Sequence, residues 1–476
     1  MAKVLKEELF NTLPAVQVDE EEITKELLKE LQEFHKKIVV LDDDPTGTQT
    51  VHDISVYTEW TEDALTQGFD EANSEFYVLT NSRAFSRQHT TEVHQTIAQR
   101  VSAIAKKTGK DFIVISRSDS TLRGHYPLET QVLKDTLEAN GAPVIDGEVL
   151  MPFFKEGGRF TIGNVHYVQE GDYLVPANET EFAQDSTFGY TAATMPEYIE
   201  EKTGGAYKAD SVTCIALEDL RAGNIDKVAA QLEAVHDFNK VIVNCTDYID
   251  VKVFALALLK AMKAGRHFMF RSAAALTKVL GGVSDKPLLT KEELVVAGNT
   301  NGGLIIIGSH VKKTTQQLEK LKELDNIDFI EFNHLMVLES DEKLEEEIQR
   351  VIDKTEANLK KGITTAVMTG RKLLKMDTKE ESLRVSVKIS DALVSIVTRL
   401  SVQPKFIIAK GGITSSDVAT KGLSIKKALV LGQVAPGIPA WKAGSESKFP
   451  GMSYVVFPGN VGAVTTLRDV VAMMNA

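Results

Sequence analysis

Cysteine is nearly missing from this 476-residue chain, whose two cysteines are Cys214 and Cys245. Two cysteines cannot form a disulfide scaffold, and their spacing matches no metal-thiolate motif, so we expect a reducing compartment. Long apolar runs are also missing, because none approaches the roughly 18 residues that a membrane helix needs. The first ten residues lack the apolar core of a secretory signal. We therefore expect a cytoplasmic protein with no membrane partner.

An excess of positive charge is lacking as well. The chain has 54 Lys and Arg against 67 Asp and Glu, which gives a net charge of −13. Nucleic-acid binding depends on clustered basic side chains, so we expect no nucleic-acid partner. The hydrophobic share of 43% and the charged share of 25% are ordinary for a soluble enzyme. The length exceeds what one hydrophobic core usually supports, so two or three domains are expected.

The pattern of apolar segments predicts an α/β fold. Continuous apolar runs, which are typical of strands buried on both faces, alternate with amphipathic helical stretches. The expected strands are 38–41, 76–80, 112–116, 241–244, 304–308, 364–369 and 406–409. The expected helices are 19–37, 91–107, 127–139, 251–264, 314–324, 344–359 and 381–400. We predict mostly parallel sheets flanked by helices.

A polar, Gly-rich segment, Gly298-Asn-Thr-Asn-Gly-Gly303, separates two halves of this pattern. We predict a helical extension over residues 1–37, one α/β domain over 38–300 and another over 301–476. Residues 140–210 have little helical period, and we expect irregular or antiparallel structure there.

In the first half, polar clusters follow three successive expected strands. They are Asp42-Asp43-Asp44-Pro-Thr-Gly-Thr48, Asn81-Ser-Arg83 and Arg117-Ser-Asp119-Ser-Thr-Leu-Arg123-Gly-His125. Ligands of open parallel sheets bind beyond the carboxyl ends of the strands, so these loops should converge on one pocket. Aspartates there can accept hydrogen bonds from sugar-like hydroxyls, and arginines can hold a carboxylate or phosphate through forked donors. The segment Gly157-Gly-Arg159-Phe-Thr161 can add a further cation.

The second half has Gly-rich loops instead of charged ones. They are Gly308-Ser309-His310, Lys410-Gly411-Gly412-Ile413-Thr414-Ser415, Gly432 to Pro439 and Pro458-Gly459-Asn460-Val-Gly462. Glycines let successive backbone amides approach a phosphate, and a helix N-terminus adds a favourable dipole. We expect Thr414-Ser415 and Gly459-Asn460 each to begin a helix. Each Gly pair is also common in ordinary turns, and neither a Walker A motif nor a dinucleotide fingerprint is present.

Taken together, these motifs resemble the four-carbon acid sugar kinase family from about Ile38 to the C-terminus. The resemblance implies that the first domain binds a sugar acid, that the second binds ATP, and that the active site lies in the cleft between the two domains. The chemistry of phosphoryl transfer adds the expectation that Mg²⁺ bridges the phosphates. It implies a phosphotransferase with an alcohol acceptor on a tetronate-like acid such as threonate, erythronate or 3-oxo-tetronate. The chain could form a homodimer.

Roles for individual residues follow from this resemblance together with the chemistry of phosphoryl transfer. Asp43 or Asp44 is expected to act as the base, and Arg123 and Arg159 to anchor the substrate carboxylate. The expected substrate-binding residues are Asp43, Asp44, Arg83, Asp119, Arg123, Arg159 and Thr161. The expected nucleotide-binding residues are Ser309, His310, Gly411, Gly412, Ile413, Thr414, Ser415, Gly432, Pro436, Gly437, Gly459, Asn460 and Gly462.

Two other functions remain open from the sequence. The Asp42–Asp44 cluster could form the metal centre of a phosphoesterase, which would release phosphate without consuming a nucleotide. Alternatively, the chain could be a non-catalytic sensor of a sugar acid and a nucleotide, which would bind both without turnover.

Overall fold

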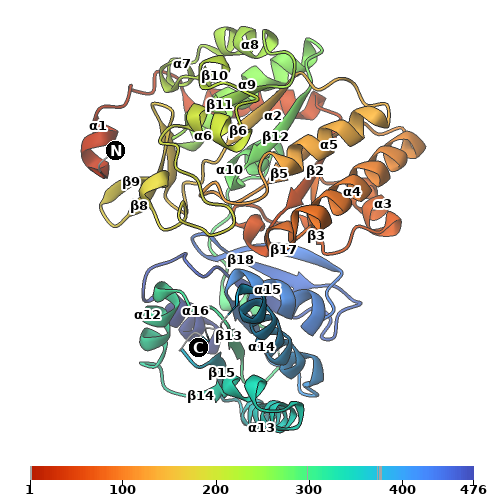
Figure 1. Ribbon diagram of the computed structural model, residues 1–476, viewed down its shortest axis with the longest axis vertical. Helices are drawn as coiled ribbons and strands as arrows, with labels where there is room; N and C mark the ends of the chain where they lie inside the picture. Colours follow the sequence, from red (N-terminus) through yellow and green to blue (C-terminus); the bar gives the residue numbers. More distant parts are fainter. Residues whose placement is uncertain (1–2, 297, 372–373, 375–377) are drawn as a thin grey trace. The chain divides into compact units, whose positions relative to one another are not determined.

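The computed structural model describes residues 3–296, 298–371, 374 and 378–476, with the backbone alone for residues 379, 380 and 383. The chain forms two compact units whose elements are labelled in Figure 1. Unit 1 consists of Met1–Gly47 and Glu59–Asp285, and unit 2 of Thr48–Thr58 and Lys286–Ala476. The boundary predicted near residue 300 differs from this division, because Lys286 already belongs to unit 2.

Parallel strands form the main sheet of unit 1, in the order β10-β11-β6-β12-β5-β2-β4. Their bounds are β2 Lys37–Asp42, β4 Glu75–Leu79, β5 Phe112–Arg117, β6 Gly147–Met151, β10 Thr213–Ile215, β11 Asn239–Val243 and β12 Phe268–Ser272. The apolar core of β2, residues 38–41, is buried throughout, as expected for a strand covered on both faces. The predicted α/β class with mostly parallel sheets is confirmed.

The helices of unit 1 pack in two groups that flank this sheet. One group contains α3, α4 and α5, and the other contains α2, α7, α8, α9 and α10. Their bounds are α2 Glu20–Glu33, α3 Glu62–Asp70, α4 Arg87–Thr108, α5 Leu128–Ala139, α6 Met195–Lys202, α7 Leu217–Arg221, α8 Ile225–Glu233, α9 Tyr248–Lys263 and α10 Ala274–Leu280. Local signals set the ends of α4, because the Ser86 side chain accepts from the His89 N–H and Gly109 ends the helix at φ +67°.

A small antiparallel sheet of order β1-β9-β8-β7 lies within the segment predicted to be irregular or antiparallel, apart from its N-terminal strand. Its strands are β1 Val4–Leu5, β7 Arg159–Ile162, β8 Val165–Glu170 and β9 Tyr173–Pro176, and helix α1 is Lys6–Asn11. The N-terminal segment is therefore part of unit 1. Phe10 of α1 packs edge-on against Phe160 of β7, with ring centroids 5.3 Å apart.

The sheet of unit 2 has the order β3-β17-β18-β19-β16-β13-β15-β14. The strands β13 Leu304–Ile307, β14 Ile327–Phe332, β15 Thr364–Thr369, β16 Ile407–Lys410 and β19 Ser453–Phe457 are parallel, whereas β3 Ser55–Tyr57, β17 Lys427–Ala435 and β18 Ile438–Ala443 pair antiparallel. Its helices are α11 Lys291–Leu294, α12 Lys312–Leu321, α13 Asp341–Lys360, α14 Lys379–Arg399, α15 Gly412–Asp417 and α16 Thr466–Asn475. Within the described residues, no helix of either unit has the length and hydropathy needed to span a bilayer.

Residues 48–58 join unit 2, although the sequence places them among strands of unit 1. Strand β3 pairs antiparallel with β17 in the register Tyr57 to Lys427. The indole Nε1–H of Trp441, which is fully buried, donates to Thr48 Oγ1 at 2.9 Å. This insertion contributes an edge strand and part of the core of unit 2.

Candidate functional site

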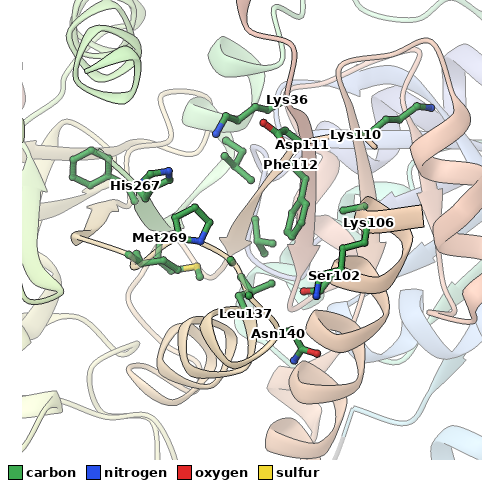
Figure 2. Close-up of a pocket in the computed structure, with 18 of the residues that line it drawn as sticks. Lys36, Ser102, Lys106, Lys110, Asp111, Phe112, Leu137, Asn140, His267 and Met269 are labelled. Atoms are coloured by element: carbon green, nitrogen blue, oxygen red, sulfur yellow. The ribbon is translucent and has the colours of Figure 1, made fainter. Parts of the chain in front are cut away.

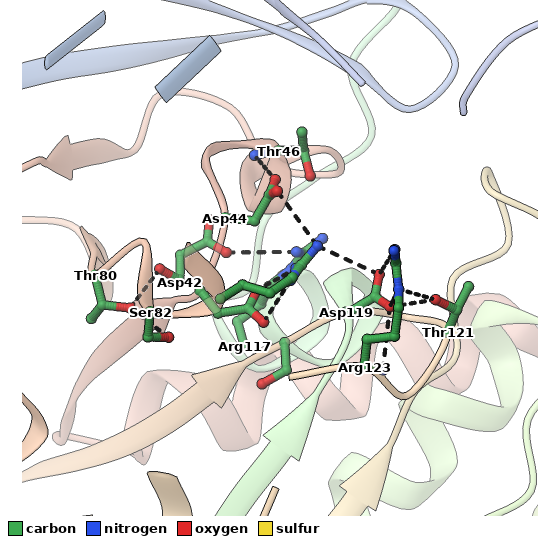
Figure 3. Close-up of polar contacts among 12 residues, drawn as sticks. Asp42, Asp44, Thr46, Thr80, Ser82, Arg117, Asp119, Thr121 and Arg123 are labelled. Atoms are coloured by element: carbon green, nitrogen blue, oxygen red, sulfur yellow. Dashed lines mark hydrogen bonds and ion pairs between the residues drawn. The ribbon is translucent and has the colours of Figure 1, made fainter. Parts of the chain in front are cut away.

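The polar loops of the first half converge in unit 1 as predicted. Strands β12, β5, β2 and β4 are neighbours and parallel, so the loops after them leave the sheet at one edge. Figure 3 shows Asp44, Asp119 and Arg123 close together beyond these strand ends. This acid–arginine cluster consists of Asp43, Asp44, Arg83, Asp119 and Arg123.

Arg83 contacts three carboxylates, those of Asp43, Asp44 and Asp119. Its Nη2 and Nε donate to the two carboxylate oxygens of Asp43 at 2.6 and 3.2 Å. Its Nη1 lies 3.4 Å from Asp44 Oδ2 and 3.7 Å from Asp119 Oδ1. Such a bidentate pair fixes both orientation and charge. Arg83 therefore holds these carboxylates in place, and its predicted contact with the substrate stays a prediction.

Asp43 combines burial with a strong ion pair. Burial raises the pKa of this carboxyl, Arg83 opposes the rise, and Glu129 and Asp44 add to it. Asp43 Oδ2, which also accepts from Arg83 Nε, faces the Gly124 backbone, since a Cβ atom at Gly124 would lie 3.2 Å from it. A carboxylate with a raised pKa is suited to accept a proton.

Asp42, the first acid of the run, belongs to the interior and not to the cluster. Its carboxylate is buried and lies 3.5 Å from Arg117 Nη1, and burial raises its pKa well above the ordinary value. The chain passes directly over it at Gly47, where a Cβ atom would lie 1.8 Å from Asp42 Oδ2. Gly47 is thus required by close approach. Arg117, proposed from the sequence as an anion binder, instead pairs with Asp42.

Asp119 and Arg123 form a compact ion pair within one loop. Arg123 Nε donates to Asp119 Oδ2 at 2.8 Å, and the Thr121 hydroxyl donates to the same oxygen. Burial tends to raise the pKa of Asp119, but Arg123 and Arg83 outweigh it and lower the pKa far below the ordinary value. Asp119 therefore stays ionised and can only accept hydrogen bonds.

Arg159 is a buried cation without a carboxylate partner. Its side chain comes from β7, the residue is 7% exposed, and no carboxylate of the described chain lies within 4 Å of its guanidinium. Among the residues that the structure describes, its Nε has no hydrogen-bond partner. Burial lowers the pKa of Arg159 to about 10, with Asp119 opposing and Arg123 adding to the shift. Arg159 and Arg123 both lie over the ring of Phe182, at 5.9 and 4.9 Å from its centroid.

Thr161 lies in the same strand, and its hydroxyl is part of a buried relay. Thr161 Oγ1 is 2.9 Å from His166 Nδ1, and His166 Nε2 is 2.8 Å from the Ser120 carbonyl. Because burial lowers the pKa of His166 to about 4, the ring is neutral, so Nε2–H donates to Ser120 and Thr161 donates to Nδ1. The relay ties the small sheet to the Asp119 loop. Thr161 thus supports the Asp119 loop through His166, which the sequence did not indicate, and its predicted contact with the substrate stays a prediction.

Arg271, which sequence reasoning missed, lies beside the acid–arginine cluster. It lies in β12, where Nη1 donates to Ser118 Oγ at 3.1 Å and Nη2 donates to the Arg123 carbonyl at 2.9 Å. Its guanidinium is also 3.7 Å from Glu129 Oε2. The apolar run Phe268-Met-Phe before Arg271 carried the same signal as the other strands, a polar residue at a strand end.

A resident metal centre is not formed by the acidic run. In the chain as described, no three His, Cys, Asp or Glu side chains are grouped so that they could hold a metal ion. Asp42 is paired with Arg117, and Asp43 and Asp44 are held by Arg83. These contacts do not favour the phosphoesterase reading of Asp42–Asp44.

In unit 2, the strand-end loops meet through small side chains and backbone. Thr314 Oγ1 lies 3.1 Å from Ser309 Oγ and donates to the Gly459 carbonyl at 3.2 Å. A Cβ atom at Gly308 would lie 2.3 Å from Thr414 Oγ1. Strands β13, β16 and β19 are parallel neighbours, so these contacts lie at their carboxyl edge. The structure thus brings Ser309, Gly411, Thr414 and Gly459 together, as predicted.

We call Gly308, Ser309, Gly411, Thr414 and Gly459 the glycine cluster. Within it, Gly411 has a backbone conformation that favours glycine. It has φ +120°, and a Cβ atom there would lie 2.9 Å from Ser309 Cβ. Helix α15 begins at Gly412 and includes Ile413, Thr414 and Ser415. The Ser415 hydroxyl donates back to the Ala409 carbonyl at 2.8 Å, and Ile413 is 63% exposed. Ser415 is therefore structural, whereas Ile413 offers an apolar surface beside the glycines.

Lys410, just before Gly411, is buried beneath this edge. Its ammonium donates to the Pro458 and Gly459 carbonyls and lies 4.2 Å from the Phe457 ring centroid. Burial lowers the pKa of Lys410 well below its ordinary value. Lys410 thereby holds the Pro458–Gly459 turn against β16.

His310 and a second missed arginine follow β13 and β15. His310 Nε2 is 3.5 Å from Thr369 Oγ1, and its Nδ1 has no hydrogen-bond partner among the residues that can be described. Arg371 donates to the Ser309 carbonyl at 2.6 Å and to Thr315 Oγ1 at 2.7 Å. Arg371 follows the predicted strand 364–369, so its position at a strand end was the available signal.

The remaining predicted nucleotide residues divide into two groups. By register, the Pro436–Gly437 turn between β17 and β18 reaches the carboxyl edge of β19, where Asn460 and Gly462 also lie. Gly432 instead lies at a bulge inside β17, with its Cβ position toward Leu289 and Lys286. The prediction that Gly459–Asn460 begins a helix is wrong. A loop continues from these residues to α16, which starts at Thr466.

Comparison with known structures supports the fold. A provisionally named tRNA synthase from Salmonella typhimurium LT2 matches with a TM-score of 0.65 and 15% identity, over 91% of this chain and 98% of that one. At this identity the match supports the fold alone. A Bordetella bronchiseptica protein of unknown function, crystallised with citrate as a domain-swapped dimer, matches with 18% identity over 92% and 98% of the chains, but its TM-score is only 0.37. No curated protein matches the sequence.

Two family profiles cover most of the chain. A sugar-binding N-terminal domain matches residues 38–280, and a nucleotide-binding C-terminal domain matches residues 304–467. The first match contains the acid–arginine cluster and Arg159, and the second contains the glycine cluster. With this pair of domains in this order, the chain belongs to the four-carbon acid sugar kinase family.

Proposed function

We propose that the protein is an ATP-dependent kinase that phosphorylates a hydroxyl of a small sugar acid, such as threonate, erythronate or 3-oxo-tetronate. The observation that carries this proposal is Arg159 of the sugar-binding domain, a buried guanidinium to which the described residues offer no carboxylate partner. An unpaired buried charge is costly, and a bound anion would compensate it. The carboxylate of a sugar acid is such an anion.

The substrate would lie between cations and acceptors. Arg159 and Arg123 flank Phe182 and would bind the carboxylate, while Asp119 and Asp44 would accept hydrogen bonds from hydroxyls. Asp119 suits this role because its lowered pKa keeps it ionised. Arg271 and Arg83 would act indirectly, since both are occupied in holding the loops and carboxylates.

Asp43 is the better candidate for the base. Arg83 fixes its orientation through two hydrogen bonds, and burial raises its pKa toward the range where proton transfer is effective. As the oxygen of the acceptor hydroxyl attacks the γ-phosphorus and ADP leaves, the Asp43 carboxylate would take the proton of that hydroxyl. Asp44, whose Oδ1 accepts from the Thr46 N–H at 2.8 Å, would orient the substrate.

The nucleotide would bind to the glycine cluster of unit 2. Gly411, Gly412 and Gly459 place no side chain over their own backbone amides, which would let phosphate oxygens approach, and the exposed Ile413 provides an apolar neighbour. Mg²⁺ would be held mainly by phosphates and waters, since it needs only one or two carboxylates, and when bound it would neutralise charge on the phosphates. This fits a chain whose described acids form no metal site of their own.

The proposal is tested by ATP turnover with four-carbon sugar acids and with the matching tetritols, which lack the carboxylate. Wild-type enzyme should prefer the acid. Arg159→Gln should raise KM for the acid by about 10–100-fold, because a hydrogen bond to a charged group contributes about 1.5–3 kcal/mol. The same variant should leave tetritol turnover and nucleotide binding nearly unchanged.

Three other results would contradict the proposal. Phosphate release without nucleotide consumption would favour a phosphoesterase. Binding of sugar acid and ATP without turnover would favour a sensor. An equal loss for acid and tetritol in Arg159→Gln would show that Arg159 does not recognise the carboxylate.

A further inference from the structure

A cavity of about 460 Å³ opens in unit 1 at the amino end of the main sheet (Figure 2). Phe112 is the first residue of β5, and Phe268 and Met269 begin β12. The last turns of α4 and α5 complete the wall. The acid–arginine cluster follows the other end of β5, five residues further along an extended strand, or roughly 16 Å away. The cavity is therefore separate from the proposed kinase site.

The inner wall of this cavity is apolar. It is formed by Phe112, Val114, Leu137, Phe268 and Met269, and Met269 is almost fully buried. The volume lies within the range of about 300–1,000 Å³ that is usual for small-molecule sites. A ligand with a compact apolar body would fit against this wall.

The rim of the cavity is mainly basic. Lys36, Lys106 and Lys110 line it, together with the single acid Asp111. Lys110 is engaged, since its ammonium donates to the Phe69 carbonyl at 2.8 Å and lies 3.2 Å from Asp70. Lys36 and Lys106 make no ion pair with any residue that the structure describes. The Lys106 ammonium reaches across to α5, because a Cβ atom at Gly141 would lie 3.6 Å from it.

Two further polar groups lie in the wall. The Ser102 hydroxyl is buried and has no hydrogen-bond partner in the described part of the chain. His267 is half-buried near Lys36, and burial together with the Lys36 charge lowers its pKa, so its imidazole is neutral at pH 7. A buried hydroxyl without a partner is costly, which favours a ligand that supplies an acceptor.

We infer that this cavity is a second small-molecule site that binds an organic anion with an apolar body, the anion at Lys36 and Lys106 and the body on Phe112, Leu137 and Met269. An anion is favoured over a cation because the two free ammonium groups outnumber the single rim acid, Asp111. Binding does not depend on the kinase reaction, since the cavity shares no residue with either ligand-binding cluster.

The test uses 1-anilinonaphthalene-8-sulfonate, which combines an aromatic body with one sulfonate, and N-phenyl-1-naphthylamine, the same skeleton without the charge. Calorimetry on the full chain with saturating ATP should give one sulfonate-bearing probe per chain. The neutral probe should bind at least 10-fold more weakly. The double change Lys36→Gln and Lys106→Gln should weaken binding of the sulfonate probe about 10-fold and leave binding of the neutral probe unchanged.

Two controls make the result specific to the cavity. Lys107→Gln removes a neighbouring exposed lysine that does not line the cavity, and should leave probe affinity unchanged. Ala105→Trp should fill the cavity and abolish binding of both probes, with ATP turnover on sugar acids retained. The inference is overturned if ATP displaces the probe, if both probes bind equally, or if Lys107→Gln weakens binding as much as the double change does.

Discussion

The two units approach ligand binding with opposite chemistry. The cluster of unit 1 consists of charged side chains whose carboxylates and guanidiniums hold one another in place, as Arg83 holds Asp43. The cluster of unit 2 consists of glycines and of serine and threonine residues, and the backbone of these residues defines its shape, as around Gly411 and Ser309. Side-chain charge suits a small, polar acid that must be oriented, whereas an open backbone suits a phosphate chain that is bound from several sides.

The same contrast extends into the interiors. Unit 1 buries Asp42, Asp43, Glu75, Arg117, Glu129, Glu148, Arg159, Asp219, Lys240, Asp250 and Arg271, whereas the described part of unit 2 buries Lys410 and Asp417. Buried charges make a structure sensitive to pH and to the loss of a partner. The comparison therefore predicts different failures in the two units.

Asp43→Asn should have the largest effect on activity. The amide cannot accept the substrate proton, so kcat should fall by about 10²–10⁴-fold, the usual contribution of a general base. Nucleotide affinity, measured by calorimetry, should stay unchanged because the proposed nucleotide-binding residues are in the other unit. Asp42→Asn is the matched control, and should leave kcat nearly intact. Equal losses in both variants would assign the effect to folding.

Gly411→Ala should damage the second cluster selectively. The new Cβ atom would stand 2.9 Å from Ser309 Cβ at φ +120°, so the loop must shift. Nucleotide affinity should fall roughly 10-fold, about 1.4 kcal/mol, with sugar-acid affinity retained. Gly451→Ala separates strain from crowding, since Gly451 also has positive φ, but its nearest contact would be Lys442 Cε at 3.8 Å. Equal losses in nucleotide affinity would show that crowding at Ser309 is unimportant.

Arg83→Gln should shift the pH dependence of the reaction. Arg83 lowers the pKa of Asp43 against the effect of burial. Without this cation the pKa of Asp43 rises further, so the acid limb of the kcat/KM profile should move to higher pH. Arg83→Lys keeps a positive charge and should shift the limb less. A limb that stays in place in Arg83→Gln would remove Asp43 as the base.

Glu75→Gln should give the smallest effect, on stability alone. Burial raises the pKa of Glu75 well above its ordinary value of 4.5, and both its oxygens lack hydrogen-bond partners in the described structure. The folded state then retains a proton that the unfolded chain releases, so unfolding free energy should fall as pH rises above 4.5, by at most about 1.4 kcal/mol per unit. The variant should lose that part of the slope in urea titrations between pH 5 and 8. An unchanged slope would contradict a protonated Glu75.

Much of the fold could be predicted because buried parallel strands are continuous apolar runs. The predicted strands at 112–116 and 364–369 correspond to β5 and β15. Strand β6 was missed because Gly147 and Glu148 interrupt its apolar pattern. The buried Glu148 carboxylate forms an ion pair with the Lys240 ammonium. The inclusion of residues 48–58 in unit 2 could not be predicted, since it depends on the pairing of β3 with β17.

The candidate site was predicted less completely than the fold, because local sequence patterns show neither burial nor contacts with distant segments. Charges at strand ends indicated Asp43, Arg83, Asp119 and Arg123, which the structure brings together, although their roles remain predictions. The sequence could not distinguish Asp42 from Asp43, because neighbouring acids carry the same local signal and differ only in burial and partner. Arg271 and Arg371 also stand at strand ends, but their hydrogen bonds to the Arg123 and Ser309 carbonyls join loops that are distant in the sequence. The hydrogen bond of His166 to the Ser120 carbonyl likewise depends on the fold, and no local pattern reveals it.

The pairing of β3 with β17 has a consequence for biosynthesis. Trp441 and its partner Thr48 are 393 residues apart, so the early segment must wait for most of the polypeptide to leave the ribosome. Contacts of such long sequence separation slow folding, and until they form the β17 edge is open to other chains. A fragment starting at Lys286 would keep that edge exposed permanently, so the nucleotide half should aggregate when it is produced alone.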